Sequence, residues 1–183
     1  MVKMQTPIKF TYEDYKNLPE SETKLYELLE GELVMVPAPV PYHQDILRNL
    51  LRLLAGHVQT QRLGKVYLAP LDVVLGEDVV QPDLLFISYE RTSVIHEEEI
   101  RGAPDLIIEI LSPATAQRDR TYKRTLYARH GVKEYWLVDP DTRTIEVLTL
   151  GTKGFRQAGR YEGDQMLISP LLAGLAIPLD QIF

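Results

Sequence analysis

The sequence predicts an α/β (α+β) fold, in which a mixed central β-sheet is flanked by helices and extra strands lie toward both termini. Residues 106–111 are apolar except for one acid, as in a strand that is buried on both faces of a sheet. Amphipathic helices are predicted before and after this strand, at 42–63 and 115–130. A strand at 133–140 follows, and this order of strand, helix and strand indicates helices packed on a mixed sheet.

The N-terminal part of the chain begins with a short helix. Thr11, followed by Asp14 three residues later, is a helix N-cap signal. Two short strands are predicted next, with a turn at Glu30 and Gly31. The long helix comes after them, and Gly64 is expected to end it. Its apolar positions recur at near-helical spacing and are Ile46, Leu47, Leu50, Leu51, Leu54 and Val58.

A hairpin is predicted after this helix. Residues 65–75 and 79–88 have the composition of strands, and the short polar segment between them is typical of a turn. Antiparallel pairing would place Asp72 opposite Pro82 or Asp83. Residues 89–104 are expected to form a polar loop or a short helix.

The C-terminal third continues the same pattern. The helix at 115–130 begins after a Ser-Pro pair and is closed by Gly131. Residues 133–140 and 144–150 are predicted to form a strand pair, and short strands with a small final helix are predicted beyond them. Tyr135 and Trp136 lie in an apolar strand and are assigned to the core.

Composition favours one soluble domain spanning residues 1–183. The chain is 45% hydrophobic and contains no cysteine, which excludes disulfides and thiolate metal sites. No apolar run is long enough to cross a bilayer or to act as a secretory signal, so a cytoplasmic location is expected. The net charge of −6 argues against general attraction to nucleic acid. Residues 116–133 are the exception, with six Lys or Arg and one Asp.

Three acids interrupt segments that otherwise suit a core. Glu109 shares a strand face with Ile107 and Leu111, and Asp83 and Asp72 stand in similar apolar surroundings. A single strand acid is more often paired with Arg at a sheet edge. Three of them beside a basic helix indicate a carboxylate site, because crowded ionised carboxylates need a cation. Hard divalent ions such as Mg²⁺ prefer such oxygen ligands.

The ordered motifs resemble the Uma2 family, formerly DUF820. They are "QPDLLFI", then "PDLIIEILSPAT", then "RDRTYKRTLYARHGVKEYWLVDP", and the resemblance extends over nearly the whole chain. It implies a restriction endonuclease-like core of the PD-(D/E)XK superfamily, with Asp83 and Glu109 at the acidic positions. It also implies Mg²⁺- or Mn²⁺-dependent cleavage of phosphodiester bonds, with DNA as the expected substrate.

One position departs from the superfamily motif. Leu111 stands where the motif has lysine, and the resemblance implies that Lys123 on the next helix replaces it. Asp119 and Lys123, four residues apart, would share one face of that helix. The alternative is a surface ion pair worth only tenths of a kcal/mol. In that case the site would bind metal without efficient cutting.

These residues suggest a consistent division of roles. Asp83, Glu109 and the backbone carbonyl of Ile110 would hold the metal. Lys123 would orient or help to deprotonate the attacking water and stabilise charge on the phosphate. The nucleic-acid backbone would be contacted by Arg118, Arg120 and Arg124.

Two further residues match the family but have no derived role. His43, at the start of the long helix, is either a cap, a packed side chain or a base. Glu27 could approach the site as an additional acid. The other histidines, His57, His96 and His130, show no metal-ligand spacing.

The leading hypothesis is therefore a metal-dependent endonuclease acting on DNA, expected as a homodimer so that two sites can address two strands. The rival is a nucleic-acid-binding or regulatory module that kept the fold and lost efficient cutting, which Leu111 favours. A hydrolase of another phosphate ester is a third alternative. Apolar residues near the C-terminus, such as Leu172 and Ile177, would serve packing or self-association.

Overall fold

The computed structural model describes residues 8–19 and 25–183. Most of the strands in these residues belong to two β-sheets. The larger sheet has the strand order β11-β10-β9-β8-β6-β3. Its strands are β3 (Gly64–Leu68), β6 (Leu84–Ser88), β8 (Leu106–Ile110), β9 (Glu134–Asp139), β10 (Thr144–Gly151) and β11 (Gly154–Tyr161). Strands β8 and β9 run parallel and the other neighbours antiparallel, so the sheet is mixed, as predicted.

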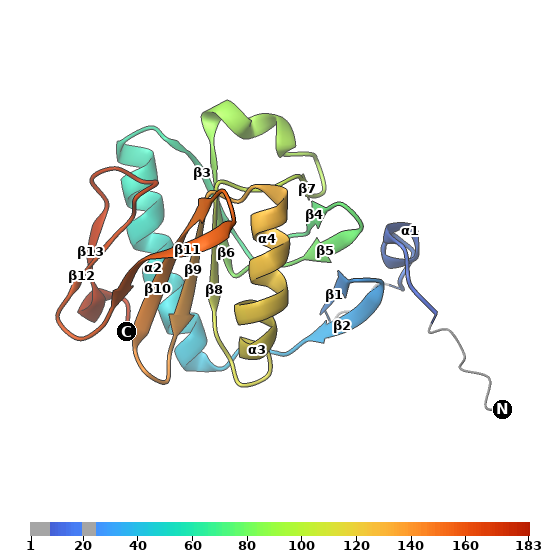
Figure 1. Ribbon diagram of the computed structural model, residues 1–183, viewed down its shortest axis with the longest axis horizontal. Coiled ribbons are helices and arrows are strands. Elements are labelled where there is room, and N and C mark those ends of the chain that lie inside the picture. The colour runs from blue at the N-terminus through green and yellow to red at the C-terminus, as the bar shows by residue number, and fades with distance from the viewer. Residues whose placement is uncertain (1–7, 20–24) are drawn as a thin grey trace.

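The smaller sheet lies beside the larger one and has the order β2-β1-β5-β4-β7. Its strands are β1 (Leu25–Leu29), β2 (Glu32–Val36), β4 (Val73–Leu75), β5 (Asp78–Val80) and β7 (Ile100–Arg101). The N-terminal helix α1 (Tyr12–Lys16) lies next to it, on the side of the molecule away from the C-terminal strands (Figure 1). These strands are β12 (Met166–Ile168) and β13 (Ala176–Pro178), followed by the 3₁₀ helix η3 (Leu179–Gln181).

The predicted single hairpin at 65–88 is wrong. Each of its two strands is broken, so that β3 pairs with β6 in the larger sheet while β4 pairs with β5 in the smaller one. The breaks contain Pro70 and Pro82, which have no N–H to donate to a strand ladder. The chain therefore crosses from one sheet to the other twice in this region.

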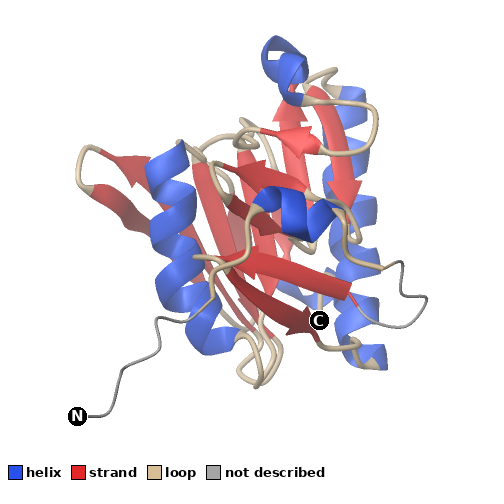
Figure 2. Ribbon diagram, turned by 90° about the vertical axis from the view of Figure 1, so that its right-hand side faces the viewer, coloured by secondary structure: helices blue, strands red, loops and turns tan. Residues whose placement is uncertain are grey.

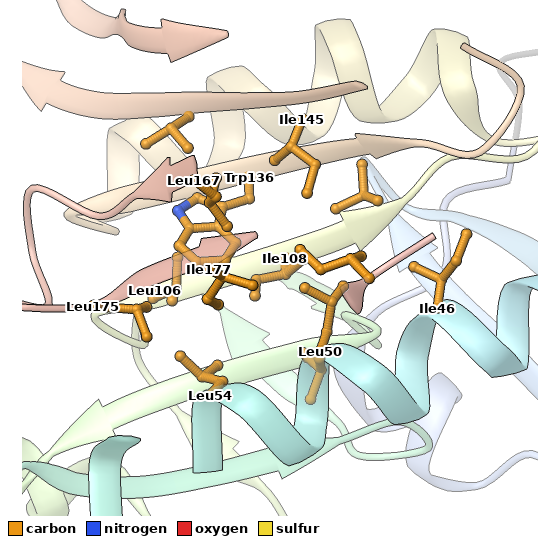
Figure 3. Close-up of a cluster of buried hydrophobic side chains, with 14 of the residues drawn as sticks. Ile46, Leu50, Leu54, Leu106, Ile108, Trp136, Ile145, Leu167, Leu175 and Ile177 are labelled. Atoms are coloured by element: carbon orange, nitrogen blue, oxygen red, sulfur yellow. The ribbon is translucent and has the colours of Figure 1, made fainter. Parts of the chain in front are cut away.

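Helix α2 (Pro41–Thr60) covers one face of the larger sheet. Figure 3 shows Ile46, Leu50 and Leu54 directed at Leu106 and Ile108 of β8. The predicted apolar positions are buried except Leu51, which is partly buried. Trp136 and Tyr135 are fully buried, which confirms their assignment to the core.

The predicted end of this helix at Gly64 is wrong. The helix ends at Thr60, and Arg62 takes the left-handed conformation that was expected of a glycine, with φ of 53°. Gly64 instead begins β3, where a Cβ would collide with the carbonyl oxygen of Ile87 on β6. A close approach of two strands therefore requires glycine at this position.

The opposite face of the larger sheet is covered by the second helical segment, as Figure 2 shows from the side. It consists of α3 (Ala116–Arg118), a π-helical turn η2 (Asp119–Lys123) and α4 (Arg124–His130), and Gly131 closes it in a left-handed conformation. The boundaries agree with the predicted helix at 115–130, whereas the π-helical turn was not predicted. π-Helical turns inside helices occur often at functional sites.

The remaining predictions of local structure are confirmed, apart from the two-residue strand β7, which lies in the predicted loop at 89–104. Thr11 and Asp14 form a reciprocal capping box at the start of α1. Glu30 and Gly31 turn the chain between β1 and β2 with positive φ values. Residues 89–104 contain the 3₁₀ helix η1 (Tyr89–Val94) and β7. No helix in the described part of the chain is long and apolar enough to span a membrane.

Candidate active site

Asp83 lies at the point where the chain passes from the smaller sheet to the larger one, directly before β6. Its Oδ2 accepts a hydrogen bond of 2.7 Å from the backbone N–H of Ile110, at the end of β8. Its Oδ1 lies 3.0 Å from Nε2 of His43, in the first turn of α2. Contacts from two other elements therefore orient both carboxylate oxygens.

Glu109 projects from β8 toward the helical segment, on the same face as Ile107 and Leu111. It is buried, and its Oε1 accepts hydrogen bonds from Lys123 Nζ at 3.0 Å and from the Tyr127 hydroxyl at 2.7 Å. Within the described residues no hydrogen bond to Oε2 of Glu109 is formed. The predicted burial of β8 on both faces is confirmed.

Lys123 is buried and its ammonium is surrounded by acids. Nζ lies 2.8 Å from Glu27 Oε1, 3.0 Å from Glu109 Oε1 and 3.5 Å from Asp119 Oδ1. The alternative of an exposed surface pair with Asp119 is wrong, because both side chains point inward from the π-helical turn. The helix thus places an ammonium group beside Glu109. The strand itself supplies none, because Leu111 stands at the usual lysine position.

The electrostatics of the cluster follow from its composition, in which four carboxylates, including Asp83, accompany one ammonium. Burial alone would lower the pKa of Lys123, but the carboxylates of Glu109, Glu27 and Asp119 outweigh it and raise that pKa. Burial raises the pKa of Glu109 well above its ordinary value. The neighbouring acids raise this pKa further, whereas Lys123 lowers it. Lys123 therefore stays charged, and it lies among more carboxyl groups than one ammonium can neutralise.

The excess of carboxylate is the feature that fits a divalent cation. Asp83 is the most accessible of the acids, with 19% of its side chain exposed, and Oε2 of Glu109 is available. Mg²⁺ is commonly held by one or two carboxylates, together with waters and substrate phosphate, rather than by a full protein cage. Among the described residues, no group of three or more His, Asp or Glu is arranged so that these side chains alone could hold a metal ion.

Asp72 does not join the cluster. Val73 pairs with Val80, so Asp72 lies beside Gln81, and the predicted pairing with Pro82 or Asp83 is wrong by one or two residues. Its Oδ1 accepts hydrogen bonds from the Tyr15 hydroxyl at 2.9 Å and from the Gln81 side-chain amide at 2.8 Å. These contacts connect α1 to the smaller sheet, and among the described residues Asp72 forms no ion pair with Lys123.

The three arginines selected for backbone contacts differ in their surroundings. Arg120 is paired with Glu146 at 2.6 Å and with Asp139 at 3.4 Å. Arg124 donates to the backbone carbonyl of Phe155 at 3.1 Å. For Arg118 no ion pair is formed within the described ranges. Arg120 and Arg124 also line a shallow surface hollow on the outer side of the helix.

Sequence reasoning missed Tyr127, which is fully buried against Glu109. Its position four residues after Lys123 places it on the same helix face and is the signal that could have revealed it. The backbone N–H of Gln81 was also missed, and it donates to Glu27 Oε1 at 2.9 Å. Such a contact depends on sheet pairing and has no sequence signal.

Comparisons with known proteins identify the family and support the fold. The Uma2 family, described as "Putative restriction endonuclease", matches residues 12–180. The crystal structure of "a putative nuclease belonging to DUF820" from Anabaena variabilis ATCC 29413 superposes with a TM-score of 0.80 and 27% identity, covering 95% of this chain and 97% of that one. An "Uncharacterized protein sll1609" from Synechocystis sp. (strain ATCC 27184 / PCC 6803 / Kazusa) is 24% identical over 149 residues, 80% of this chain and 84% of the relative. The chain belongs to the Uma2 family.

Proposed function

We propose that this protein is a Mg²⁺- or Mn²⁺-dependent endonuclease that hydrolyses phosphodiester bonds of DNA. The observation that carries the proposal is the position of Lys123, whose ammonium lies 3.0 Å from Glu109 although it comes from a helix rather than from the strand. An acid pair with an adjacent ammonium suits metal-assisted hydrolysis of a phosphodiester, because the acids can hold the ion and the ammonium can stabilise charge on the phosphate. The nuclease description of the family and of the Anabaena protein supports it.

Each residue has a distinct task in this proposal. Asp83 and Glu109 hold the ion, and the backbone carbonyl of Ile110 is the third proposed oxygen ligand. The bound ion would acidify a water molecule and polarise the scissile phosphate. Lys123 stabilises the negative charge that builds on the phosphate. The raised pKa of Lys123 keeps its side chain protonated. An ammonium has no lone pair to accept a proton, so Lys123 is suited to this electrostatic task rather than to deprotonation of the water.

The second candidate is a nucleic-acid-binding module with the same fold and little activity. It is favoured by Leu111 at the usual lysine position and by the lack of a three-ligand cage in the described residues. In that case Lys123 would serve mainly to neutralise buried acids. A divalent ion would then bind weakly, and DNA would be bound without being cut.

The deciding experiment is cleavage of plasmid DNA and single-stranded DNA with Mg²⁺ or Mn²⁺, with RNA and a small phosphodiester as further substrates. Asp83→Asn, Glu109→Gln and Lys123→Met are each expected to abolish cutting. The matched control is Glu97→Gln, which removes an exposed acid after η1. Metal-dependent binding of DNA by wild type, without cutting above the level of the three variants, would support the binding module instead.

A homodimer is part of the same proposal, because cutting both strands of a duplex requires two sites. Analytical ultracentrifugation of the protein, alone and with a DNA duplex under Ca²⁺, measures the state directly. A monomer under both conditions would limit the proposal to nicking or to single-stranded substrates.

A further inference from the structure

Glu27 reaches the site from a different sheet than the other acids. It lies on β1 of the smaller sheet, whereas Glu109 is on β8 of the larger sheet and Asp119 is on the π-helical turn. Its Oε1 is 2.8 Å from Lys123 Nζ, the shortest of the three distances to that ammonium. The side chain is 5% exposed, so the contact is almost free of solvent screening.

The backbone of the smaller sheet holds Glu27 in this position. Strand β1 pairs antiparallel with β5, with Leu28 opposite Val79. This register brings the N–H of Gln81 to within 2.9 Å of Glu27 Oε1. A rigid strand pair therefore aims the carboxylate, and Gln81 lies two residues before Asp83 in the chain.

Lys123 needs a counter-ion that Glu109 alone cannot supply. Oε1 of Glu109 is shared between Lys123 and Tyr127, and a cation held by Glu109 would draw on the same negative charge and repel the ammonium. Asp119 is more distant, at 3.5 Å. Glu27 is the nearest acid and has no proposed contact with the ion, so it can keep the ammonium in place while Glu109 is engaged.

We propose that Glu27 is the positioning residue of Lys123, and that the smaller sheet is thereby a working part of the site. Glu27 acts through Lys123 and does not touch the substrate. Only the kinetic consequence rests on the proposed nuclease function, since the contact itself is a property of the protein without substrate.

The first test follows the Lys123 ammonium directly in full-length protein labelled with ¹⁵N-lysine. A buried, hydrogen-bonded ammonium exchanges its protons slowly and gives an observable signal, which is identified by its loss in Lys123→Arg. Glu27→Gln retains an oxygen that can accept the Gln81 N–H but removes the charge. We expect this substitution to move the Lys123 signal or broaden it away. Glu27→Asp keeps the charge and should restore part of the signal.

The second test uses DNA cleavage. In Glu27→Gln we expect kcat to fall by about 10- to 100-fold, as when a residue that orients a catalytic group is lost, with KM within about twofold of wild type. Glu27→Asp should recover part of kcat. The control is Glu32→Gln, which removes an exposed acid from the same β1–β2 hairpin and should leave both the signal and kcat unchanged.

The outcomes separate the two proposals. An unmoved Lys123 signal in folded Glu27→Gln would overturn the role of Glu27, whether or not the protein cuts DNA. A lower kcat with an unmoved signal and a lower melting temperature would also overturn it, because a merely structural role would explain both. If wild type cuts nothing while the signal moves as expected, the nuclease proposal fails and the pairing of Glu27 with Lys123 stands.

Discussion

Tyr127 donates its hydroxyl to the same Glu109 oxygen that receives the Lys123 ammonium, at a distance of 2.7 Å. Two donors on Oε1 fix the direction of the carboxylate, so that Oε2 is the oxygen left for a further ligand. Tyr127 is itself held by an edge-to-face contact with Tyr135, with ring centroids 5.1 Å apart. The orientation of the strand acid thus depends on an aromatic pair behind it.

Replacing Tyr127 with Phe should weaken both stability and activity. The ring contact with Tyr135 remains, but the hydrogen bond to a buried carboxyl oxygen is lost, which costs about 1–3 kcal/mol. We expect urea unfolding to show this loss and the cleavage rate to fall about tenfold. Tyr135→Phe is the control, since its hydroxyl donates to the Asp119 carbonyl and not to Glu109. Equal rates in the two variants would contradict a role for Tyr127 in orienting Glu109.

His43→Ala should weaken metal binding rather than the fold. Nε2 of His43 lies 3.0 Å from Asp83 Oδ1, and groups that orient a metal ligand typically change affinity by about 10- to 100-fold. Isothermal titration with Mn²⁺ measures this change without any substrate. His96→Ala removes an exposed histidine from the loop before β7 and should match wild type. An unchanged Mn²⁺ affinity in His43→Ala would show that Asp83 is oriented by Ile110 alone.

Arg118→Gln should affect DNA binding more than Arg120→Gln does. Each phosphate contact contributes about 0.9 to the slope of log affinity against log salt concentration. The charge of Arg120 is already paired with Glu146 and Asp139, so removal of this side chain should weaken the attraction for phosphate only slightly. Fluorescence anisotropy over a salt series, in an Asp83→Asn background to prevent cutting, gives both slopes. Equal slopes for the two variants would show that the ion pairs of Arg120 open when DNA binds.

Asp105→Asn should destabilise the protein in a pH-dependent way. Asp105 is fully buried before β8, where it accepts from the Ser88 N–H at 2.8 Å and pairs with Lys133 at 2.7 Å. Burial works to raise its pKa, but Lys133 and Ser88 outweigh it and hold the pKa below its ordinary value of 3.8. At neutral pH we expect a loss of about 1–3 kcal/mol.

The pH dependence of this loss of stability follows from the lowered pKa of Asp105. A carboxyl group with a lower pKa in the folded protein stabilises it above the unfolded pKa, and this contribution is lost as pH falls through the folded value. The difference in unfolding free energy between wild type and Asp105→Asn should therefore be constant from pH 7 to about 5 and shrink below about pH 4. A difference that grows on acidification would contradict the pairing with Lys133.

The sequence predicted the parts of the fold that depend on local patterns. Helix α2, the turn at Glu30 and Gly31, and the strand around Glu109 all have short-range signals, namely helical spacing, a positive-φ turn and an apolar run. The apolar surroundings of Asp83 and Glu109 predict a carboxylate site, and the family resemblance adds Lys123 to it. The structure brings Lys123 to Glu109 directly and Asp83 into the same cluster.

The errors at 65–88 share a physical cause, which is that the chain crosses from one sheet to the other between consecutive strands. The segments at 65–75 and 79–88 alternate as continuous strands, and only tertiary packing decides that each is divided between sheets. The position of Asp72 depends on the pairing register of its strand, because a shift of one residue moves every side chain to the opposite face. The π-helical turn likewise has no recognisable sequence pattern, although two of its side chains, Asp119 and Lys123, are buried.

The division of the acids between two sheets also has a consequence for how the protein is made. Glu27 leaves the ribosome early, and Lys123 emerges only after all five strands of the smaller sheet and three of the six strands of the larger one have been synthesised. Any product of interrupted translation that stops before the π-helical turn carries Glu27, Asp83 and Glu109 without the Lys123 ammonium. Under the nuclease function proposed above, such a truncated chain would lack the ammonium that cleavage of DNA needs.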